Sequence, residues 1–108
     1  MDADARREAA RLLLDCWDRR AVVAELPEPL RPLTKIDAYA IQAALKPTPV
    51  FGWKVAASSV AGQRHINVAS PLAGRLFADK VRPDGGAVGL RGNRMRVAEV
   101  EFAFRMGV

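Results

Sequence analysis

Three prolines fall within eight residues, in the stretch LPEPLRPL from Leu26 to Leu33, and they constrain the fold more than any other feature of the sequence. Each proline ring fixes φ, removes a backbone donor and disfavours the helical conformation in the residue before it. The stretch is therefore predicted to be extended. It separates a helical pattern on its N-terminal side from a second helical pattern that follows.

Both helical patterns carry their own start signals. Asp2 is the predicted N-cap of the first helix, and the apolar positions from Ala5 to Trp17 repeat with the helical period. Thr34 is predicted to cap the second helix, with Asp37 three residues later as in a capping box, and Pro47 is expected to lie beyond its end. The apolar side of this second helix is predicted to contain Ile36, Tyr39, Ala40, Ala43 and Ala44.

After the second helix the pattern becomes that of β structure. VFGWKVAA, from Val50 to Ala57, is rich in aromatic and β-branched residues and is predicted to be a buried strand, followed by a short helix through about His65. From Ser70 onward turns alternate with predicted short strands in SPLAGRLFADKV and AVGL, with turn signals at PDGG, Pro83 to Gly86, and at the pair Gly92-Asn93. The chain closes on a final predicted strand, MRVAEVEFAFRMGV, Met95 to Val108. Helices followed by mostly β structure predict an α+β fold.

Composition limits the classes of protein to consider. The length of 108 residues and the hydrophobic content of 50% are typical of one globular domain, and Trp17 and Trp53 are expected in its core. Cys16 is the only cysteine, which excludes an intramolecular disulfide and a cysteine-based zinc site and fits a reducing cytoplasm. The N-terminal residues lack a signal-peptide pattern and no apolar run approaches about 18 residues, so a soluble cytoplasmic protein without a membrane partner is expected.

The net charge of +5 raises the question of a nucleic-acid partner, since Lys and Arg neutralise phosphates. The basic residues are spread from Arg6 to Arg105, and only those between Arg91 and Arg96 come close together, without the interleaved aromatic residues of a single-strand binder. Nucleic acid is therefore not the expected partner, and a non-catalytic basic binding module is kept as an alternative.

Glu99 and Glu101 are the most informative residues of the final run. Side chains alternate across a strand, so these two point to the same face, roughly 7 Å apart, on a strand that is otherwise largely apolar. One interpretation is an edge strand whose glutamates face water or pair with arginines between Arg91 and Arg96 across a hairpin. The other is a metal site, because two close carboxylates repel and a hard divalent cation compensates their charge.

Other candidate residues carry weaker signals. Lys54 is the one charge in the first predicted strand, where it either snorkels to the rim or contacts a substrate. Asp79 has the pattern of a turn aspartate, and His65, the only histidine, is more typical of a helix end than of a metal ligand. Ser58 and Ser59 are predicted to cap a helix. A role as nucleophile is not expected, because the sequence near them offers no histidine and acid that could activate a serine.

Four motifs follow one another along the chain: IDAYAIQ, GWKVAASS, INVASPLAGRLFAD and MRVAEVEFAF. In their order and spacing, from about Leu33 to Val108, the chain resembles the N-terminal part of a 2-keto-4-pentenoate hydratase of the fumarylacetoacetate hydrolase superfamily. The resemblance implies an N-terminal helix and proline-rich link over residues 1–33. It also implies that residues 34–108 are the first, truncated part of a catalytic domain that leads into a mixed β-roll. The 108-residue chain alone is then expected to be inactive.

The activity that this resemblance implies is the addition of water to a short unsaturated 2-oxo acid in the degradation of aromatic compounds, with Mg2+ or Mn2+ as cofactor. Glu99 and Glu101 correspond to two metal ligands of the family, and Lys54 and Asp79 to catalytic residues of its pocket. A third carboxylate ligand is implied beyond Val108.

Substrate contacts are implied at Ser58 and Ser59, although Ala57-Ser58 stands where many hydratases have leucine-threonine or threonine-serine. Two sister activities on the same scaffold stay open, a 2-oxo-3-enedioate decarboxylase and a hydrolase that cleaves a carbon-carbon bond in an acylpyruvate. Members of the family usually associate as homo-oligomers, which is the expectation for the complete protein.

Overall fold

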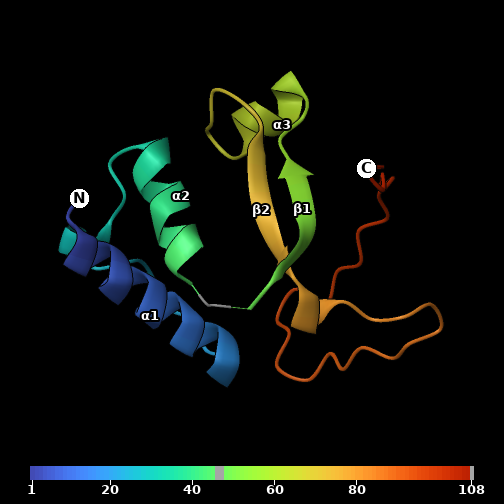
Figure 1. The fold of residues 1–108 in the computed structure, drawn as a ribbon. Coiled ribbons are helices and arrows are strands. Elements are labelled where there is room, and N and C mark those ends of the chain that lie inside the picture. Colours follow the sequence, from blue (N-terminus) through green and yellow to red (C-terminus); the bar gives the residue numbers. More distant parts are fainter. Residues whose placement is uncertain (46–47, 108) are drawn as a thin grey trace.

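The computed structural model describes residues 1–45 and 48–107, and in these ranges helices precede a two-stranded antiparallel sheet (Figure 1). This arrangement confirms the α+β prediction at the level of fold class. In chain order the elements are helix α1 (Ala3–Arg19), the 3-10 turn η1 (Glu28–Leu30), helix α2 (Lys35–Ala44), strand β1 (Val50–Ala56), helix α3 (Val60–His65), strand β2 (Leu72–Phe77) and the 3-10 turn η2 (Ala78–Lys80).

Helix α1 begins and ends with local hydrogen bonds. The Asp2 carboxylate accepts from the Ala5 backbone N–H at 2.8 Å, which confirms the predicted N-cap. At the other end Arg20 adopts the left-handed conformation with φ 55°, and its N–H donates to the carbonyls of Cys16 and Trp17. Backbone groups at both ends of α1 therefore have hydrogen-bond partners in residues next to the helix.

The proline-rich stretch is only partly extended, so the prediction for it was wrong at its centre. Glu28–Leu30 forms one 3-10 turn, closed by a hydrogen bond of 2.8 Å from the Leu30 N–H to the Pro27 carbonyl, and Leu30 is buried. Proline is tolerated in the first turn of a helix because its missing donor has no partner there in any case. Pro27 and Arg31, on either side of the turn, keep the predicted extended backbone.

Helix α2 begins as predicted. The Thr34 hydroxyl accepts from the Asp37 N–H at 3.1 Å, and the helix ends at Ala44. Pro47, expected to lie beyond the helix, is outside the described residues.

The buried side of α2 differs from the predicted one. Ile36 is 78% exposed, whereas Asp37 and Ile41, one helical turn apart, are buried. Residues four positions apart lie on the same side of a helix, so Asp37 and Ile41 face α1 together. Ile36 does not belong to this side of the helix.

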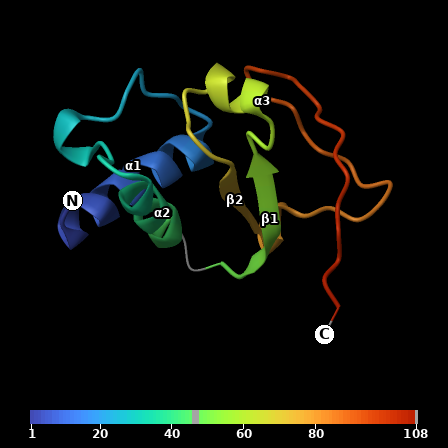
Figure 2. The same cartoon turned by 90° about the horizontal axis from the view of Figure 1, so that it is seen from above.

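The core lies between α1 and α2, which run side by side in Figures 1 and 2. Alanines on α1 allow the helix backbones to approach closely, and larger apolar side chains from α1, η1, α2 and the residue after α2 pack around them. The buried cluster consists of Ala9, Ala10, Leu30 and Ile41, with Met1, Ala5, Leu12, Leu13 and Leu45 packed against it.

Strands β1 and β2 pair with Trp53 opposite Arg75 and Val55 opposite Ala73. Helix α2 covers the outer edge of β2. The Gln42 side-chain amide donates to the Ala73 carbonyl at 3.2 Å and accepts from the Arg75 N–H at 3.0 Å, and the Tyr39 hydroxyl accepts from the Ala73 N–H at 3.1 Å. These side chains take the place of a neighbouring strand.

Strand β1 was predicted to be buried, and this prediction was wrong. Phe51, Trp53 and Val55 are 61%, 54% and 56% exposed. Helices α1 and α2 lie on the β2 side of the sheet, so β1 forms the far margin with its apolar side chains uncovered (Figure 1). The short helix α3 follows β1 and ends at His65, as predicted. It is capped by the Ser59 hydroxyl, which accepts a hydrogen bond of 3.1 Å from the Gly62 N–H.

The residues after η2 form turns without regular structure. The PDGG turn is confirmed by a hydrogen bond of 2.9 Å from the Gly86 N–H to the Pro83 carbonyl, and the GN turn by one of 3.0 Å from the Asn93 N–H to the Leu90 carbonyl. The strand predicted at AVGL is not present.

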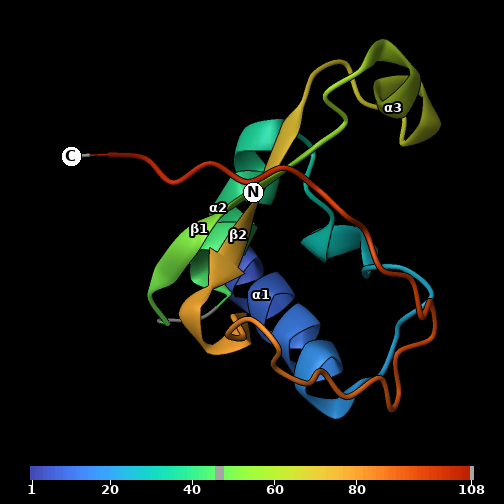
Figure 3. The same ribbon diagram turned by 90° about the vertical axis from the view of Figure 1, so that its right-hand side faces the viewer.

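The final strand predicted over Met95 to Val108 is also not present in the described residues, which end at 107. A strand needs a hydrogen-bonded neighbour, and the segment makes no ladder with either strand of the sheet. Arg96, with φ 49°, interrupts an extended backbone at its start. Figure 3 shows the segment crossing the molecule in front of β1. Of the helices described, none has the length and apolar character that a bilayer-spanning segment requires.

Candidate functional site

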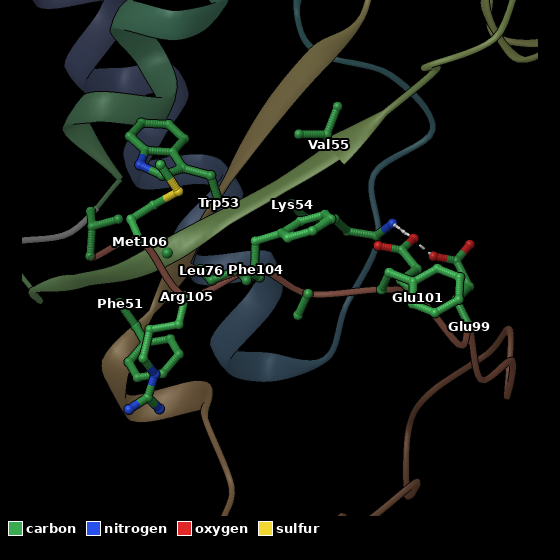
Figure 4. A pocket seen from close by; sticks show the side chains of 14 residues that line it. Phe51, Trp53, Lys54, Val55, Leu76, Glu99, Glu101, Phe104, Arg105 and Met106 are labelled. Carbon is green, nitrogen blue, oxygen red and sulfur yellow. Dashed lines mark hydrogen bonds and ion pairs between the residues drawn. The ribbon is translucent and has the colours of Figure 1, made fainter.

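An open groove of about 1390 Å³ runs along β1, and we call it the β1 groove (Figure 4). Strand β1 lines it from Val50 to Val55, with Leu76 from β2. The C-terminal segment lines it from the other side through Glu99 and residues 101–106. The groove therefore forms between two parts of the chain that are far apart in the sequence.

A cluster of three charges lies in this groove. The Lys54 Nζ lies 3.0 Å from Glu99 Oε2 and donates a hydrogen bond to Glu101 Oε1, as the dashed lines in Figure 4 show. Lys54 belongs to β1, whereas the two glutamates follow more than forty residues later. Three residues that the sequence analysis selected separately are thus brought together.

Hydrogen bonding to Glu101, and then to Glu99, raises the pKa of the Lys54 ammonium above its ordinary value. The ammonium consequently stays protonated at neutral pH and acts as a positive charge, not as a proton acceptor. All three side chains are partly exposed, so water screens these ion pairs and they contribute little to folding stability.

In the described part of the chain the two glutamates do not pair with the arginines between Arg91 and Arg96, which was one of the two partners that the edge-strand interpretation allowed, but both are partly exposed to water, which was the other. They share one cationic partner, Lys54, and therefore converge although their segment is not a strand. Two converging carboxylates have the oxygen donors that a hard divalent cation prefers, so the pair fits a partial metal shell. Among the described residues no group of three or more His, Cys, Asp or Glu side chains is placed to hold a metal ion.

The other residues selected from the sequence lie elsewhere. Asp79 belongs to η2, beyond the end of β2, and is not among the residues that line the β1 groove. Ser59 caps α3 at the opposite end of β1, and Ser58 precedes it, also outside the groove lining. The roles assigned to these three residues stay predictions.

The aromatic character of the groove was not foreseen. Phe102 and Phe104 are 99% and 89% exposed, and Trp53, predicted as a core residue, carries the Arg75 guanidinium 5.5 Å from its ring centroid. Trp17 is also more exposed than predicted and packs against Phe77 with ring centroids 6.0 Å apart. The alternation of side chains in the final segment predicted an apolar face. It did not predict which part of the molecule this face would contact.

A second charged cluster lies between α1 and α2 and has a structural role. The buried Asp37 carboxylate accepts from the Thr34 hydroxyl at 2.9 Å and from Arg6 Nη2 at 3.4 Å. The hydrogen bond from Thr34, helped by Arg6, lowers the pKa of Asp37, while burial acts in the opposite direction. The capping-box pattern placed Asp37 near Thr34, but neither the hydrogen bond from the Thr34 hydroxyl to the carboxylate nor the contact with Arg6 was predicted.

Comparison with protein-family models, with curated proteins and with solved structures finds no match for this chain. The three converging charges and the apolar groove beside them are therefore the observations from which a function must be argued.

Proposed function

We propose that this chain is part of a metal-dependent hydratase of the fumarylacetoacetate hydrolase superfamily, which adds water to a short unsaturated 2-oxo acid. The observation that carries the proposal is the convergence of Lys54, Glu99 and Glu101. The residues come from two of the four motifs that resemble the family, and they meet in a groove with apolar walls. A divalent cation held by the two glutamates beside an apolar groove would suit a substrate with a carboxylate end and a hydrocarbon chain.

Glu99 and Glu101 would hold Mg2+ or Mn2+, with water and the substrate's own oxygens supplying further ligands. The bound ion would supply Lewis acidity toward the carboxylate and 2-oxo oxygens of the substrate. In the structure the Lys54 ammonium interacts with both carboxylates, so it neutralises them when no other cation does. Lys54 and a divalent cation would therefore compete for the same oxygens.

Lys54 would act on the substrate through its charge. A protonated ammonium stabilises the negative charge that develops on a substrate oxygen when a carbon-bound proton is removed. After protonation of the far carbon, water adds to the enone and a 4-hydroxy-2-oxo acid is formed.

The apolar residues of the groove would position the hydrocarbon part of the substrate. Phe51, Trp53 and Phe104 lie along the groove and offer flat surfaces to an unsaturated chain (Figure 4). A mixed β-roll beyond the two described strands, a homo-oligomer and a cytoplasmic location belong to this proposal. Asp79 is assigned to orient Lys54 or a water in the complete protein.

Metal binding tests the proposal first. In the complete protein, Glu99→Gln and Glu101→Gln should each weaken Mn2+ binding in calorimetry, whereas Glu25→Gln should leave it unchanged. Glu25 is a matched control because it is exposed and pairs with Arg31 at 2.9 Å, away from the groove. Equal Mn2+ affinity in all three variants and the wild type would remove Glu99 and Glu101 from the metal site.

Turnover tests the reaction. The complete protein with Mg2+ should hydrate 2-hydroxypenta-2,4-dienoate, which is followed by the loss of its ultraviolet absorbance. A panel with a 2-oxo-3-enedioate and an acylpyruvate separates the hydratase from the sister decarboxylase and hydrolase. A folded, metal-binding protein that turns over none of these substrates would refute the activity.

A further inference from the structure

Strand β1 has an outer edge that is ready to accept another strand. In an antiparallel pair, opposite residues alternate between those that bond each other and those whose backbone groups point away. Ala73 and Arg75 of β2 point away, since their groups bond to side chains of α2. Their partners Val55 and Trp53 therefore direct N–H and C=O groups to the outer edge of β1.

The C-terminal segment lies beside this edge. It runs in the opposite direction to β1, as Figures 2 and 4 show, and large apolar residues alternate with polar or small ones from Glu99 to Met106. Its apolar side chains are almost fully exposed, with Val100 at 100% and Phe102 at 99%. A segment with the pattern of a strand thus lies next to a strand without an outer neighbour, and each has backbone groups that the other can bond.

The ion pair between Lys54 and Glu101 sets the register in which the two would pair. With these two residues opposite each other in an antiparallel arrangement, Glu99 lies diagonal to Lys54 on the same face, within reach of its long side chain. On the other face the apolar residues of β1 that follow the bulge at Phe51 then meet apolar residues of the segment, Trp53 with Phe102 and Val55 with Val100.

A register shifted by one residue would lose this match. It would turn Glu99 and Glu101 to the face of Trp53 and Val55 and leave Lys54 without an acidic neighbour. The observed ion pairs and the apolar alternation therefore specify the same register independently.

We infer that residues 99–105 add to the outer edge of β1 as a third antiparallel strand, with Glu101 opposite Lys54. The addition buries Trp53 against Phe102 and supplies partners to the outer groups of Trp53 and Val55. It also holds the three charges of the cluster on one face of the sheet, where their spacing no longer depends on an irregular segment. The strand comes from the same chain because the segment already contacts β1 through Lys54, and a tethered segment has a high effective concentration. The inference does not depend on the proposed activity.

A pair of cysteines tests the register. Gly52 and Ala103 would be opposite each other on the face of Lys54, in a pair without mutual hydrogen bonds, where Cα atoms lie about 4.5 Å apart and a disulfide is feasible. A Cβ atom at Gly52 meets only Leu76 Cδ1, at 4.0 Å, so the site tolerates a cysteine. In the complete protein carrying Cys16→Ser, Gly52→Cys with Ala103→Cys should oxidise to an intrachain crosslink that peptide mapping identifies.

The matched control is Gly52→Cys with Phe102→Cys, whose side chains would point to opposite faces and should not crosslink. Equal crosslinking of both pairs, or none with the first, would overturn the register. A crosslink between two chains would overturn the assignment to the same chain and indicate strand exchange between copies.

Proline substitutions and amide exchange test the hydrogen bonds. In the inferred register the Val100 N–H points to Val55, whereas the Ala103 N–H points away from β1. The amides of Trp53 and Val55 should exchange at least about tenfold more slowly in the wild type than in Val100→Pro, and Ala103→Pro should keep the slow exchange. Fast exchange at both amides in the wild type would overturn the inference, as would equal effects of the two prolines.

Discussion

Lys54 of β1 donates a hydrogen bond to Glu101, which lies 47 residues further along the chain. Both residues interrupt stretches that are otherwise apolar, VFGWKVA in β1 and VAEVEFAF near the C-terminus. Together with the contact to Glu99, this bond associates the final segment with the sheet. The charged residues thus form the contact between the segment and the sheet, in addition to being candidates for metal and substrate binding.

Replacing Lys54 should separate metal binding from catalysis. In Lys54→Met the competing ammonium is lost, so Mn2+ should bind to Glu99 and Glu101 more tightly in calorimetry. Turnover of the dienoate should fall by about two orders of magnitude because the charge that stabilises the developing oxyanion is gone. Lys54→Arg keeps the charge and should retain more turnover than the methionine variant. Normal turnover in Lys54→Met would leave the lysine without a role in the reaction.

The lowered pKa of Asp37 predicts a loss of stability in acid. A carboxyl whose pKa is lower in the folded than in the unfolded state stabilises the fold above its ordinary pKa of 3.8, and the contribution is lost as the pH falls toward the folded-state value. Thermal unfolding should therefore depend less on pH below about 4 in Asp37→Asn than in the wild type. The control Asp84→Asn removes an exposed turn carboxylate and should keep the wild-type profile. Parallel profiles of the wild type and Asp37→Asn would contradict the prediction.

Gln42 should contribute more to stability than its position on a helix surface suggests. Gln42→Ala removes a donor to the Ala73 carbonyl and an acceptor for the Arg75 N–H, and should destabilise the fold by about 1–3 kcal/mol in urea unfolding. The control is Gln63→Ala, which loses one hydrogen bond of 3.1 Å to the Ala57 carbonyl and should cost about 1 kcal/mol or less. A larger loss in the control would mean that α2 does not protect the edge of β2.

The connection between β1 and α3 contains backbone strain at Ala57, where φ is 56°. A residue with a Cβ atom is disfavoured in this conformation by roughly 1–2 kcal/mol, and glycine is not. Ala57→Gly should therefore stabilise the protein by up to about 1 kcal/mol in thermal unfolding. The neighbouring Ala56→Gly lies in the strand and should destabilise it by about 0.5–1 kcal/mol. Destabilisation of similar size in both variants would exclude strain at Ala57.

Helix starts were the part of the fold that the sequence determined most fully. Asp2, Thr34 and Ser59 cap their helices as predicted, because each cap bonds a backbone N–H only three residues away. Interactions of this range depend on neighbours in the chain. The α+β class and the presence of β1 follow from the order of such local patterns.

The sequence also selected Lys54, Glu99 and Glu101, because a charge in an apolar run is conspicuous without any structure. The sequence could not show that these residues meet. It also could not show that the two glutamates would pair with Lys54 and not with the nearby arginines. Asp79, Ser58 and Ser59 were assigned to the site because of the resemblance to the hydratase family, and the structure places them outside the β1 groove.

Only the tertiary structure decided which apolar surfaces are covered. Periodicity indicates that Trp53 and the final segment have apolar faces, but burial depends on whether another element packs there. Helix α2 covers the edge of β2 through Gln42. On the other side of the sheet, the segment that contains Glu99 and Glu101 contacts β1 through Lys54. Capping is a local property with one answer for a given sequence. Strand pairing instead joins residues that are distant in the chain, so its outcome depends on the competition among all available partners in space.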